Sequence, residues 1–330
     1  MNFALLANRA FRVLATGALL TLPGCQAIMR SAISSEVTAT LKEIQSPEWM
    51  GSQVKGDVEL VKLADDLYAY RWAGYRTVFL TTSEGVILFD PINPVAAPGI
   101  AKAIASVAPN PQIRYVIYSH HHADHASGAS LLPGHPTILA HANAARDIKA
   151  WTHDGVATPT EVWEGNEHEV SLGEKSVKLF LLPISHTDGN VVMLIPHRRA
   201  LYIVDVFPGK KSVTLLGAPF HSYHGDLRAL AKVQSLDYDL VIPGHGKIGT
   251  KEDVTNYVTF LHDAKAQIAK SVKKLGLGEV FAEVQNPKVG ALLFDAYDAL
   301  QPKYGNWSGY EHHMLSALQW VLVFDSVLSE

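Results

Sequence analysis

The stretch that decides the fold covers residues 115–128 and reads YVIYSHHHADHASG. The run Tyr115–Ser119 is rich in aromatic and β-branched residues, which is typical of a buried strand. This pattern stops at a cluster in which four of six consecutive positions carry candidate metal ligands, namely His120, His122, Asp124 and His125. The sequence therefore predicts a strand that delivers a polar site at its end.

The spacing of this cluster indicates two adjacent sites. In an extended segment alternate side chains point the same way, so His120 and His122 can bind one metal together. Asp124 and His125 follow where the chain turns toward Gly128, and they can address a neighbouring ion. The side chain of His121 is expected to point the opposite way, so we interpret it as a residue that binds no metal.

Three further candidate ligands follow predicted strands elsewhere in the chain. His186 lies in the stretch SHTDGN, Asp205 ends an apolar run, and His245 lies in PGHG directly after a strand. Residues that converge from strand ends onto a rigid scaffold are typical of a functional site at the rim of a sheet. We expect these three residues to complete the two sites.

The rest of the chain predicts two groups of strands, each followed by helices. This order favours two sheets packed face to face with helices outside. The expected strands are Val58–Leu63, Leu67–Arg71, Thr77–Thr82, Val86–Asp90, Tyr115–Ser119, Ser176–Leu182, Val191–Ile195, Leu201–Val206 and Leu240–Ile242. The expected helices are Gly99–Val107, Asp226–Leu236, Lys251–Leu275, Val289–Leu300 and Tyr310–Leu328.

The N-terminus has the pattern of an export signal. Arg9 and Arg12 precede an apolar run too short to span a bilayer, and the run ends at Cys25, the single cysteine among 330 residues. Residues 1–25 resemble a bacterial lipoprotein signal, in which this cysteine would carry a lipid anchor, and a plain secretory signal is the alternative. Either interpretation predicts an exported protein, in the periplasm on a lipid anchor or secreted.

Four segments follow from these patterns. Residues 1–25 are the expected signal peptide and residues 26–55 a linker. Residues 56–250 are the expected catalytic domain, and residues 251–330 a helical C-terminal extension packed on the same domain. No pattern in the sequence indicates an oligomeric state.

The motif His120-x-His122-x-Asp124-His125, followed by His186, Asp205 and His245, resembles that of the metallo-β-lactamase superfamily over about residues 58–250. The resemblance implies an αβ/βα four-layer sandwich of two mixed sheets with outer helices. It also implies that His120, His122 and His186 bind a first metal, that Asp124, His125 and His245 bind a second, and that Asp205 bridges both.

Ligands of this kind favour two divalent ions, with zinc expected first and iron, manganese or cobalt as alternatives. Two ions about 3.5–4 Å apart would lower the pKa of a shared water and supply a bridging hydroxide near pH 7. We expect Asp124 to act as a catalytic residue that orients this nucleophile. The predicted activity is metal-dependent hydrolysis of an ester, lactone, thioester or amide bond in a small molecule.

The alternatives differ in substrate and in chemistry. Many β-lactamases of the family carry cysteine or serine where this chain has Asp205, so the resemblance favours a broader hydrolase over a β-lactamase. His122 disfavours the flavodiiron oxidoreductases, which carry glutamate there, although a metal-binding or redox protein without hydrolytic activity remains an alternative. The net charge of −4 and the absence of a basic stripe argue against a nucleic-acid partner.

Other residues have two interpretations each. Asp90 either steadies a ligand histidine or caps a turn before Pro91. In the loop from Phe207 to Asp226 a pocket role competes with ordinary surface or core positions, and we favour the latter for each residue. The residues concerned are Lys210, Lys211, Phe220, His221, Tyr223 and His224, together with the aromatic residues Trp151, Trp163 and Trp307.

Overall fold

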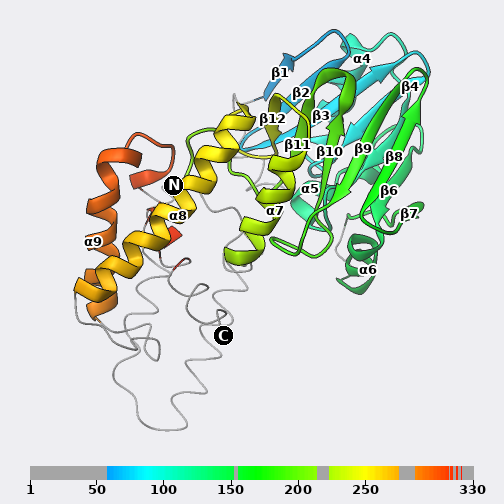
Figure 1. Cartoon of the computed structure of the whole chain (residues 1–330). Coiled ribbons are helices and arrows are strands. Elements are labelled where there is room, and N and C mark those ends of the chain that lie inside the picture. Colours follow the sequence, from blue (N-terminus) through cyan, green and yellow to red (C-terminus); the bar gives the residue numbers. More distant parts are fainter. Residues whose placement is uncertain are drawn as a thin grey trace. The chain divides into compact units, whose positions relative to one another are not determined.

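Short β-rich runs pair into two sheets in the computed structural model of the protein (Figure 1). The structure describes residues 58–151, 155–213, 223–274 and 287–311, and scattered residues between 313 and 321. The signal and linker predicted for residues 1–55 lie outside the described residues.

The first sheet has seven strands in chain order: β1 (Val58–Lys62), β2 (Leu67–Trp72), β3 (Tyr75–Thr82), β4 (Gly85–Phe89), β5 (Ile113–Ile117), β6 (Thr137–His141) and β7 (Glu161–Trp163). The second has six strands in the reverse order, β13 (Gly249–Thr250), β12 (Leu240–Pro243), β11 (Ala200–Ile203), β10 (Val191–Ile195), β9 (Lys175–Leu181) and β8 (Glu167–Leu172). The described helices are α4 (Ala97–Val107), α5 (Ala123–Ala126), α6 (Ala142–Trp151), α7 (Tyr223–Ser235), α8 (Lys251–Lys274) and α9 (Pro287–Tyr304), with short 3-10 turns η1 (Ala129–Leu131) and η2 (Pro196–Arg198).

Alternation along the strands divides the core into layers. On β10, Val191, Met193 and Ile195 join the cluster between the two sheets, whereas Val192 and Leu194 join the cluster on the outer face. Because strand side chains alternate between faces, both faces of this strand must be apolar, and all five residues are buried. The sequence thus forms a sheet covered on both sides.

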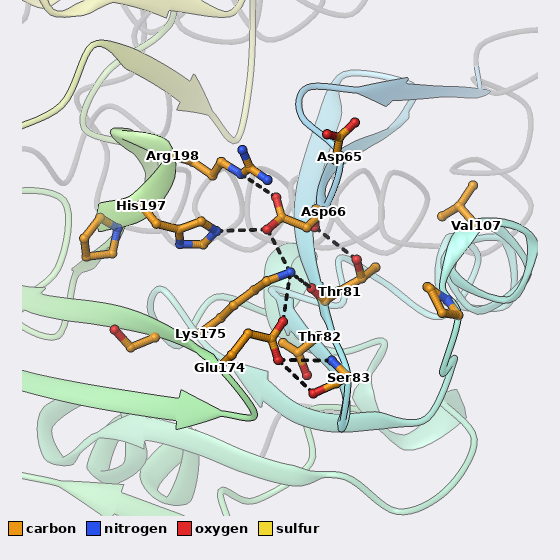
Figure 2. Close-up of a pocket in the computed structure, with 13 residues that line it drawn as sticks. Asp65, Asp66, Thr81, Thr82, Ser83, Val107, Glu174, Lys175, His197 and Arg198 are labelled. Carbon is orange, nitrogen blue, oxygen red and sulfur yellow. Dashed lines mark hydrogen bonds and ion pairs between the residues drawn. The ribbon is translucent and has the colours of Figure 1, made fainter.

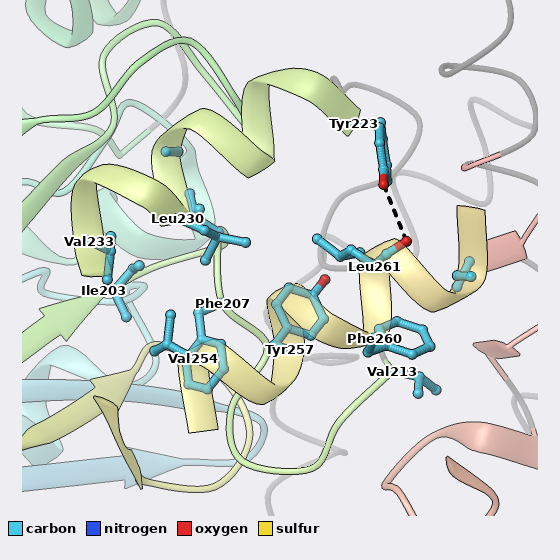
Figure 3. Close-up of a cluster of buried hydrophobic side chains, with 14 of the residues drawn as sticks. Ile203, Phe207, Val213, Tyr223, Leu230, Val233, Val254, Tyr257, Phe260 and Leu261 are labelled. Atoms are coloured by element: carbon cyan, nitrogen blue, oxygen red, sulfur yellow. Dashed lines mark hydrogen bonds between the residues drawn. The ribbon is translucent and has the colours of Figure 1, made fainter. Parts of the chain in front are cut away.

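Helices cover the outer face of the second sheet. Ile203 of β11 packs with Leu230 of α7 and with Val254 and Tyr257 of α8 in one buried cluster (Figure 3). The hydroxyl of Tyr223 donates a hydrogen bond to the carbonyl of Leu261, which ties α7 to α8. On the first sheet, α4 packs so closely that a Cβ on Gly99 would lie 2.2 Å from the hydroxyl oxygen of Tyr70. Helices therefore lie outside both sheets, and the predicted fold class is confirmed.

Parallel strand pairs bring the ends of several strands to one edge. Strands β4, β5 and β6 run parallel, as do β11 and β12, and helices supply the crossovers that such pairs need. The segments after β5, β11 and β12 carry the predicted ligands His120, Asp205 and His245. The edge at the ends of these strands is therefore where the predicted site is assembled.

A second polar cluster lies next to the C-terminal end of β10, away from the predicted site. It consists of Asp66, Lys175, His197 and Arg198, and we call it the Asp66 cluster. Lys175 Nζ and His197 Nε2 lie 2.8 and 2.9 Å from Asp66 Oδ2, and Arg198 Nε lies 2.6 Å from Oδ1 (Figure 2). These contacts line a cavity of about 700 Å³ and join the β1–β2 connection to the second sheet. Burial favours the neutral acid, but the hydrogen bonds from Arg198, Lys175 and His197 hold the pKa of Asp66 well below its ordinary value.

The structure differs from the sequence-based predictions mainly in the strands and helices that were not predicted. The helix expected from Gly99 begins at Ala97, because Pro98 is tolerated in the first turn, where its missing N–H has no helical partner. Strands β6, β7 and β8 and helix α6 were not predicted. The tail helix expected over Tyr310–Leu328 is helical at its described residues up to Val321. Among the helices that the structure describes, none is both long and apolar enough to cross a bilayer.

Candidate metal centre

The predicted ligand run is a turn followed by a short helix. Residues 119–121 form bends, His122 is the N-cap of α5, and Asp124 and His125 lie within that four-residue helix. The expectation of an extended segment was therefore wrong, although the residues still converge. The chain turns where Gly128 approaches the first sheet, and a Cβ there would lie 2.4 Å from the carbonyl oxygen of Pro91. Glycine thus permits the turn that places Asp124 and His125.

Seven side chains form two adjacent groups of ligand atoms, each group lying within 4.8 Å. In the first group, His186 Nε2 lies 2.8 Å from His122 Nδ1 and 3.3 Å from Asp205 Oδ2, and His120 Nε2 lies 3.4 Å from the same oxygen. We call His120, His122, His186 and Asp205 the first group.

The second group consists of Asp124, His125 and His245. His125 Nε2 lies 3.1 Å from His245 Nε2 and 3.6 Å from Asp124 Oδ2. Asp205 also reaches this group, since its Oδ2 lies 3.4 Å from His125 Nε2 and its Oδ1 lies 3.2 Å from His245 Nε2. The structure thus brings all seven predicted ligands together, with the Asp205 carboxylate between the groups.

Local backbone features position the three ligands of the second sheet. Asn190 Oδ1 accepts hydrogen bonds from the backbone N–H and the hydroxyl of Thr187, which fixes the turn that carries His186. Asp205 has a φ of +61°, an uncommon value for a non-glycine residue and one found at constrained functional positions. Gly246, with a φ of +77°, allows the chain to turn directly after His245.

Asp90 is fully buried next to the ligand turn. Its Oδ1 accepts a hydrogen bond of 2.7 Å from the backbone N–H of Ser119, whose hydroxyl lies 2.9 Å from His120 Nδ1. Burial raises the pKa of Asp90 to about 6. Asp90 therefore supports His120 through Ser119, which favours the first of its two predicted interpretations.

Burial and mutual contact shift the titration of the histidines in opposite directions. Burial lowers the pKa of His120 to about 3 and that of His122 to about 4, so both rings are neutral at pH 7 and offer a lone pair. Burial also disfavours charge on His125, but the carboxylates of Asp205 and Asp124 outweigh this and raise its pKa to about 10. Burial likewise opposes ionisation of Asp205, whose pKa is nevertheless held well below its ordinary value, chiefly by the charge of His125.

The donor set fits divalent metal ions. His120 Nε2 and Asp205 Oδ1 are buried and have no hydrogen-bond partner of good geometry among the described residues. Buried polar atoms without partners are costly, and a cation placed between the groups would satisfy both atoms. Imidazole and carboxylate ligands without sulfur suit zinc, with iron, manganese and cobalt as alternatives.

The remaining predicted candidates lie outside the two groups. His121 Nδ1 lies 3.6 Å from Asp147 Oδ2. Tyr223 is buried in the cluster of Figure 3, and Trp307 packs against the same cluster. Trp163 is buried against the ring of His141, and Lys210 Nζ lies 3.7 Å from Asp253. Lys211 is exposed and His224 is half-buried, whereas Phe220, His221 and the side chain of Trp151 lie outside what the structure describes.

Two features of the site were not predicted from the sequence. The first is the hairpin between β2 and β3, whose residue Tyr75 lies against His125 and His245. The second is α6, where Asn143 donates a hydrogen bond to the carbonyl of Asp188 and Arg146 pairs with the Asp188 carboxylate. A signal existed for the hairpin, because Ala73-Gly74 lies between two strand-like runs and marks a tight turn.

A comparison with known families identifies this arrangement. The model of the metallo-β-lactamase superfamily matches residues 71–245, which are more than half of the chain and include all seven candidate ligands. The chain belongs to the metallo-β-lactamase superfamily. The resemblance inferred from the ligand motif is thereby confirmed.

Individual relatives extend this assignment. Over 216 residues the chain is 31% identical to the 2,4-dinitroanisole O-demethylase subunit alpha of Nocardioides sp. (strain JS1661), a match that covers 64% of each protein. It is 27% identical over 206 residues to the beta-lactamase-like protein 2 homolog of Caenorhabditis elegans, covering 61% of this chain and 66% of the relative. The matched part is thus slightly less than two thirds of either relative.

The solved structures agree in fold. A metallo-β-lactamase from Pontibacter korlensis superposes with a TM-score of 0.54 at 16% identity, covering 62% of this chain and 99% of that one. The superposition supports a shared sandwich fold, and at this low identity it says nothing about the substrate. The comparisons and the geometry together therefore show a member of the superfamily with a His/Asp site that could bind metal.

Proposed function

We propose that this protein is a dinuclear-metal hydrolase that cleaves an ester, lactone, thioester or amide bond in a small molecule. The observation that carries this proposal is the position of the Asp205 carboxylate between the two groups. Its Oδ2 faces His120 and His186 of the first group and His125 of the second, and its Oδ1 faces His245 of the second. A carboxylate in this position can bridge two cations, because each oxygen is available to a different ion.

The two ligand groups would supply the electrophilic side of the reaction. His120, His122 and His186 would hold one ion, Asp124, His125 and His245 the other, and Asp205 would bind both. Bound metal would polarise a carbonyl and lower the pKa of a water molecule toward neutrality. Two divalent ions bring four positive charges against the two carboxylates, so the site would favour a substrate carboxylate or a developing oxyanion.

Asp124 is the residue we propose for handling the proton of the nucleophile. Its side chain is 44% exposed, whereas the side chains of His125 and Asp205 are 0% and 7% exposed. Because Asp124 is more open to solvent than His125 and Asp205, it can orient an attacking water and pass a proton outward. His125 and Asp205 lack this access, since protein surrounds them.

The test measures metal content and turnover in the same preparations. The full chain is loaded with zinc and assayed on an ester, a lactone, a thioester, an amide and a β-lactam, together with a His122→Ala variant. We expect two zinc ions and hydrolysis of at least one substrate in the parent. The His122→Ala variant should bind less zinc and lose hydrolysis. His262→Ala, which changes an exposed histidine of α8, should match the parent. Full activity in His122→Ala would refute the ligand assignment.

The same panel separates the alternatives. Turnover confined to the β-lactam would support β-lactamase activity, and two bound metals without turnover would favour a metal-binding or redox protein. The panel should also include 2,4-dinitroanisole, because a 31%-identical relative is named as an O-demethylase of this compound. Turnover of this ether would extend the proposed substrates beyond carbonyl compounds.

We also propose that the chain is exported and carries a lipid on Cys25. The apolar run before this cysteine supports the proposal. Labelling with a fatty-acid analogue in a bacterial host should mark the membrane fraction of the parent, whereas Cys25→Ser should lose the label. An equally labelled variant would refute the anchor.

A further inference from the structure

The hairpin between β2 and β3 is joined to the loop that carries His245. Trp72 pairs with Tyr75 across a turn formed by Ala73 and Gly74. The next residue, Arg76, donates its backbone N–H to the carbonyl of Gly244 at 2.7 Å. The Arg76 guanidinium donates to the carbonyls of Pro243 and Gly246 at 3.1 and 2.7 Å. These contacts surround His245 on both sides in sequence, so the hairpin fixes the position of this loop.

The hairpin also fixes the ring of His245. His245 Nδ1 donates a hydrogen bond of 2.9 Å to the carbonyl of Gly74. A histidine that donates one ring N–H to a carbonyl presents its other nitrogen as a lone pair in a set direction. In this protein that nitrogen is Nε2, which points toward Asp205 Oδ1 at 3.2 Å.

Tyr75 packs against both histidines of the second group and lies near its carboxylate. Its ring lies 4.7 Å from the ring of His245 and 5.5 Å from that of His125, measured between centroids, in tilted and edge-on arrangements. Burial raises the pKa of its hydroxyl, and the neighbouring carboxylate of Asp124 adds to this effect. No contact of Tyr75 with a histidine of the first group is seen in the described part of the chain. One side chain of the first sheet thus packs on the whole second group.

We propose that Tyr75, aided by the Gly74 carbonyl, is the positioning residue of the second group and sets its affinity for a divalent cation independently of the first group. The inference rests on the metal centre proposed above. The ring limits rotation of the His125 and His245 imidazoles, and the hydroxyl orients the exposed Asp124 carboxylate. Outer partners of this kind commonly change metal affinity by about 10- to 100-fold.

The competing explanation is that Tyr75 only fills space at the end of β3. The two explanations separate at the hydroxyl, because phenylalanine keeps the ring and loses the hydroxyl next to Asp124. Packing alone predicts that Tyr75→Phe leaves metal binding unchanged. Positioning predicts a weaker second site with no change in the fold of the metal-free protein.

The experiment is a double-mutant cycle on zinc affinity in the full chain, with a chelator as competitor and circular dichroism as the check on folding. His186→Ala weakens the first group and leaves the second. His245→Ala does the reverse. Tyr75→Phe is introduced into each background and into the parent. Tyr68→Phe is the matched control, because this tyrosine of β2 donates to the carbonyl of Asp65, away from the metal centre.

We expect Tyr75→Phe to weaken zinc binding by about 10- to 100-fold in the His186→Ala background and by less than about 3-fold in the His245→Ala background. In the parent background, Tyr75→Phe should lower the affinity for one of the two zinc ions, and Tyr68→Phe should change the affinity for neither. Equal affinity with and without the hydroxyl in His186→Ala would overturn the inference while leaving the metal centre intact. A parent protein that binds no zinc would overturn both together.

Discussion

Two buried carboxylates lie at opposite ends of β10, and their surroundings differ. The side chains of Asp66 and Asp205 are both 7% exposed. Asp66 has a lysine, an arginine and a histidine within 2.9 Å. Asp205 faces histidine nitrogens at 3.2–3.4 Å, and among the described residues none makes a hydrogen bond of good geometry to its Oδ1.

This difference separates a structural carboxylate from a ligand. Burying a charge is tolerated when the chain itself supplies permanent cations, as it does around Asp66. Around Asp205 the chain supplies imidazoles, of which His120 and His122 are neutral at pH 7 because burial lowers the pKa of each. His125 is charged because the carboxylates of Asp205 and Asp124 raise its pKa, and a metal ion that binds this ring would replace its proton. An external cation would therefore complete the environment of Asp205, whereas that of Asp66 is already complete.

The largest expected effect comes from Asp205→Ala. This change should lower zinc affinity by more than about 100-fold, because removing a shared ligand costs more than removing an outer partner. Metal analysis of the purified protein, together with a chelator competition, measures the effect. Without metal, the variant and the parent should have similar free energies of unfolding. If the variant retained two zinc ions, Asp205 would not be a metal ligand and the contrast with Asp66 would be refuted.

Asp66→Asn should show the opposite behaviour. It leaves Lys175 and Arg198 without their partner, and we expect a loss of about 2–3 kcal/mol in the free energy of unfolding. This value lies below that of a fully buried pair, because both cations are partly exposed. Urea unfolding of the metal-free protein measures it, and zinc stoichiometry should stay at the parent value. Asp65→Asn is the control, since the Asp65 side chain is 90% exposed.

The pH dependence sharpens the same contrast. The pKa of Asp66 is held below its ordinary value near 4, so its stabilisation is present above about pH 4 and falls as the pH drops below that. The difference in unfolding free energy between the parent and Asp66→Asn should therefore be constant from pH 5 to 7 and narrow below about pH 4. Both proteins are measured free of metal. A difference that widens toward low pH would contradict this account.

The smallest expected effect is that of Arg146→Ala. Arg146 pairs with Asp147 and Asp188 close to the first group, but its side chain is 56% exposed. Exposed pairs contribute little, so we expect less than about 1 kcal/mol in stability and less than about 3-fold in zinc affinity. Thermal unfolding and the same competition assay check this. A loss as large as that of Asp66→Asn would show that proximity to the site outweighs burial.

The sequence predicted which side chains converge better than the geometry that holds them. Histidines and aspartates that follow strand-like runs can be recognised from the sequence alone, and all seven candidate ligands converge as expected. The extended path assumed for His120–His122 was wrong, since local turn geometry depends on the close approach at Gly128. The long helix predicted as Lys251–Leu275 matches α8 because its apolar periodicity extends over many turns.

What escaped prediction depends on contacts between distant segments. Tyr75 and Gly74 face His245 only after β3 and the loop beyond β12 come together, and ordinary strand composition gives no hint of this pairing. Strand β8 was missed because only Val170 and Leu172 along it are buried apolar residues, which is a weak alternation. Its existence is determined by pairing with β9 and not by its own sequence.

The divided origin of the ligands has one more consequence. His125 follows a strand of the first sheet and His245 a strand of the second, 120 residues further along the chain. A cation held by both would act as a cross-link between the two halves of the sandwich, in a chain whose single cysteine cannot form an internal disulfide. By the entropy of closing so long a loop, such a link is worth about 4–5 kcal/mol. Metal supply would then govern the lifetime of the folded protein as well as its chemistry.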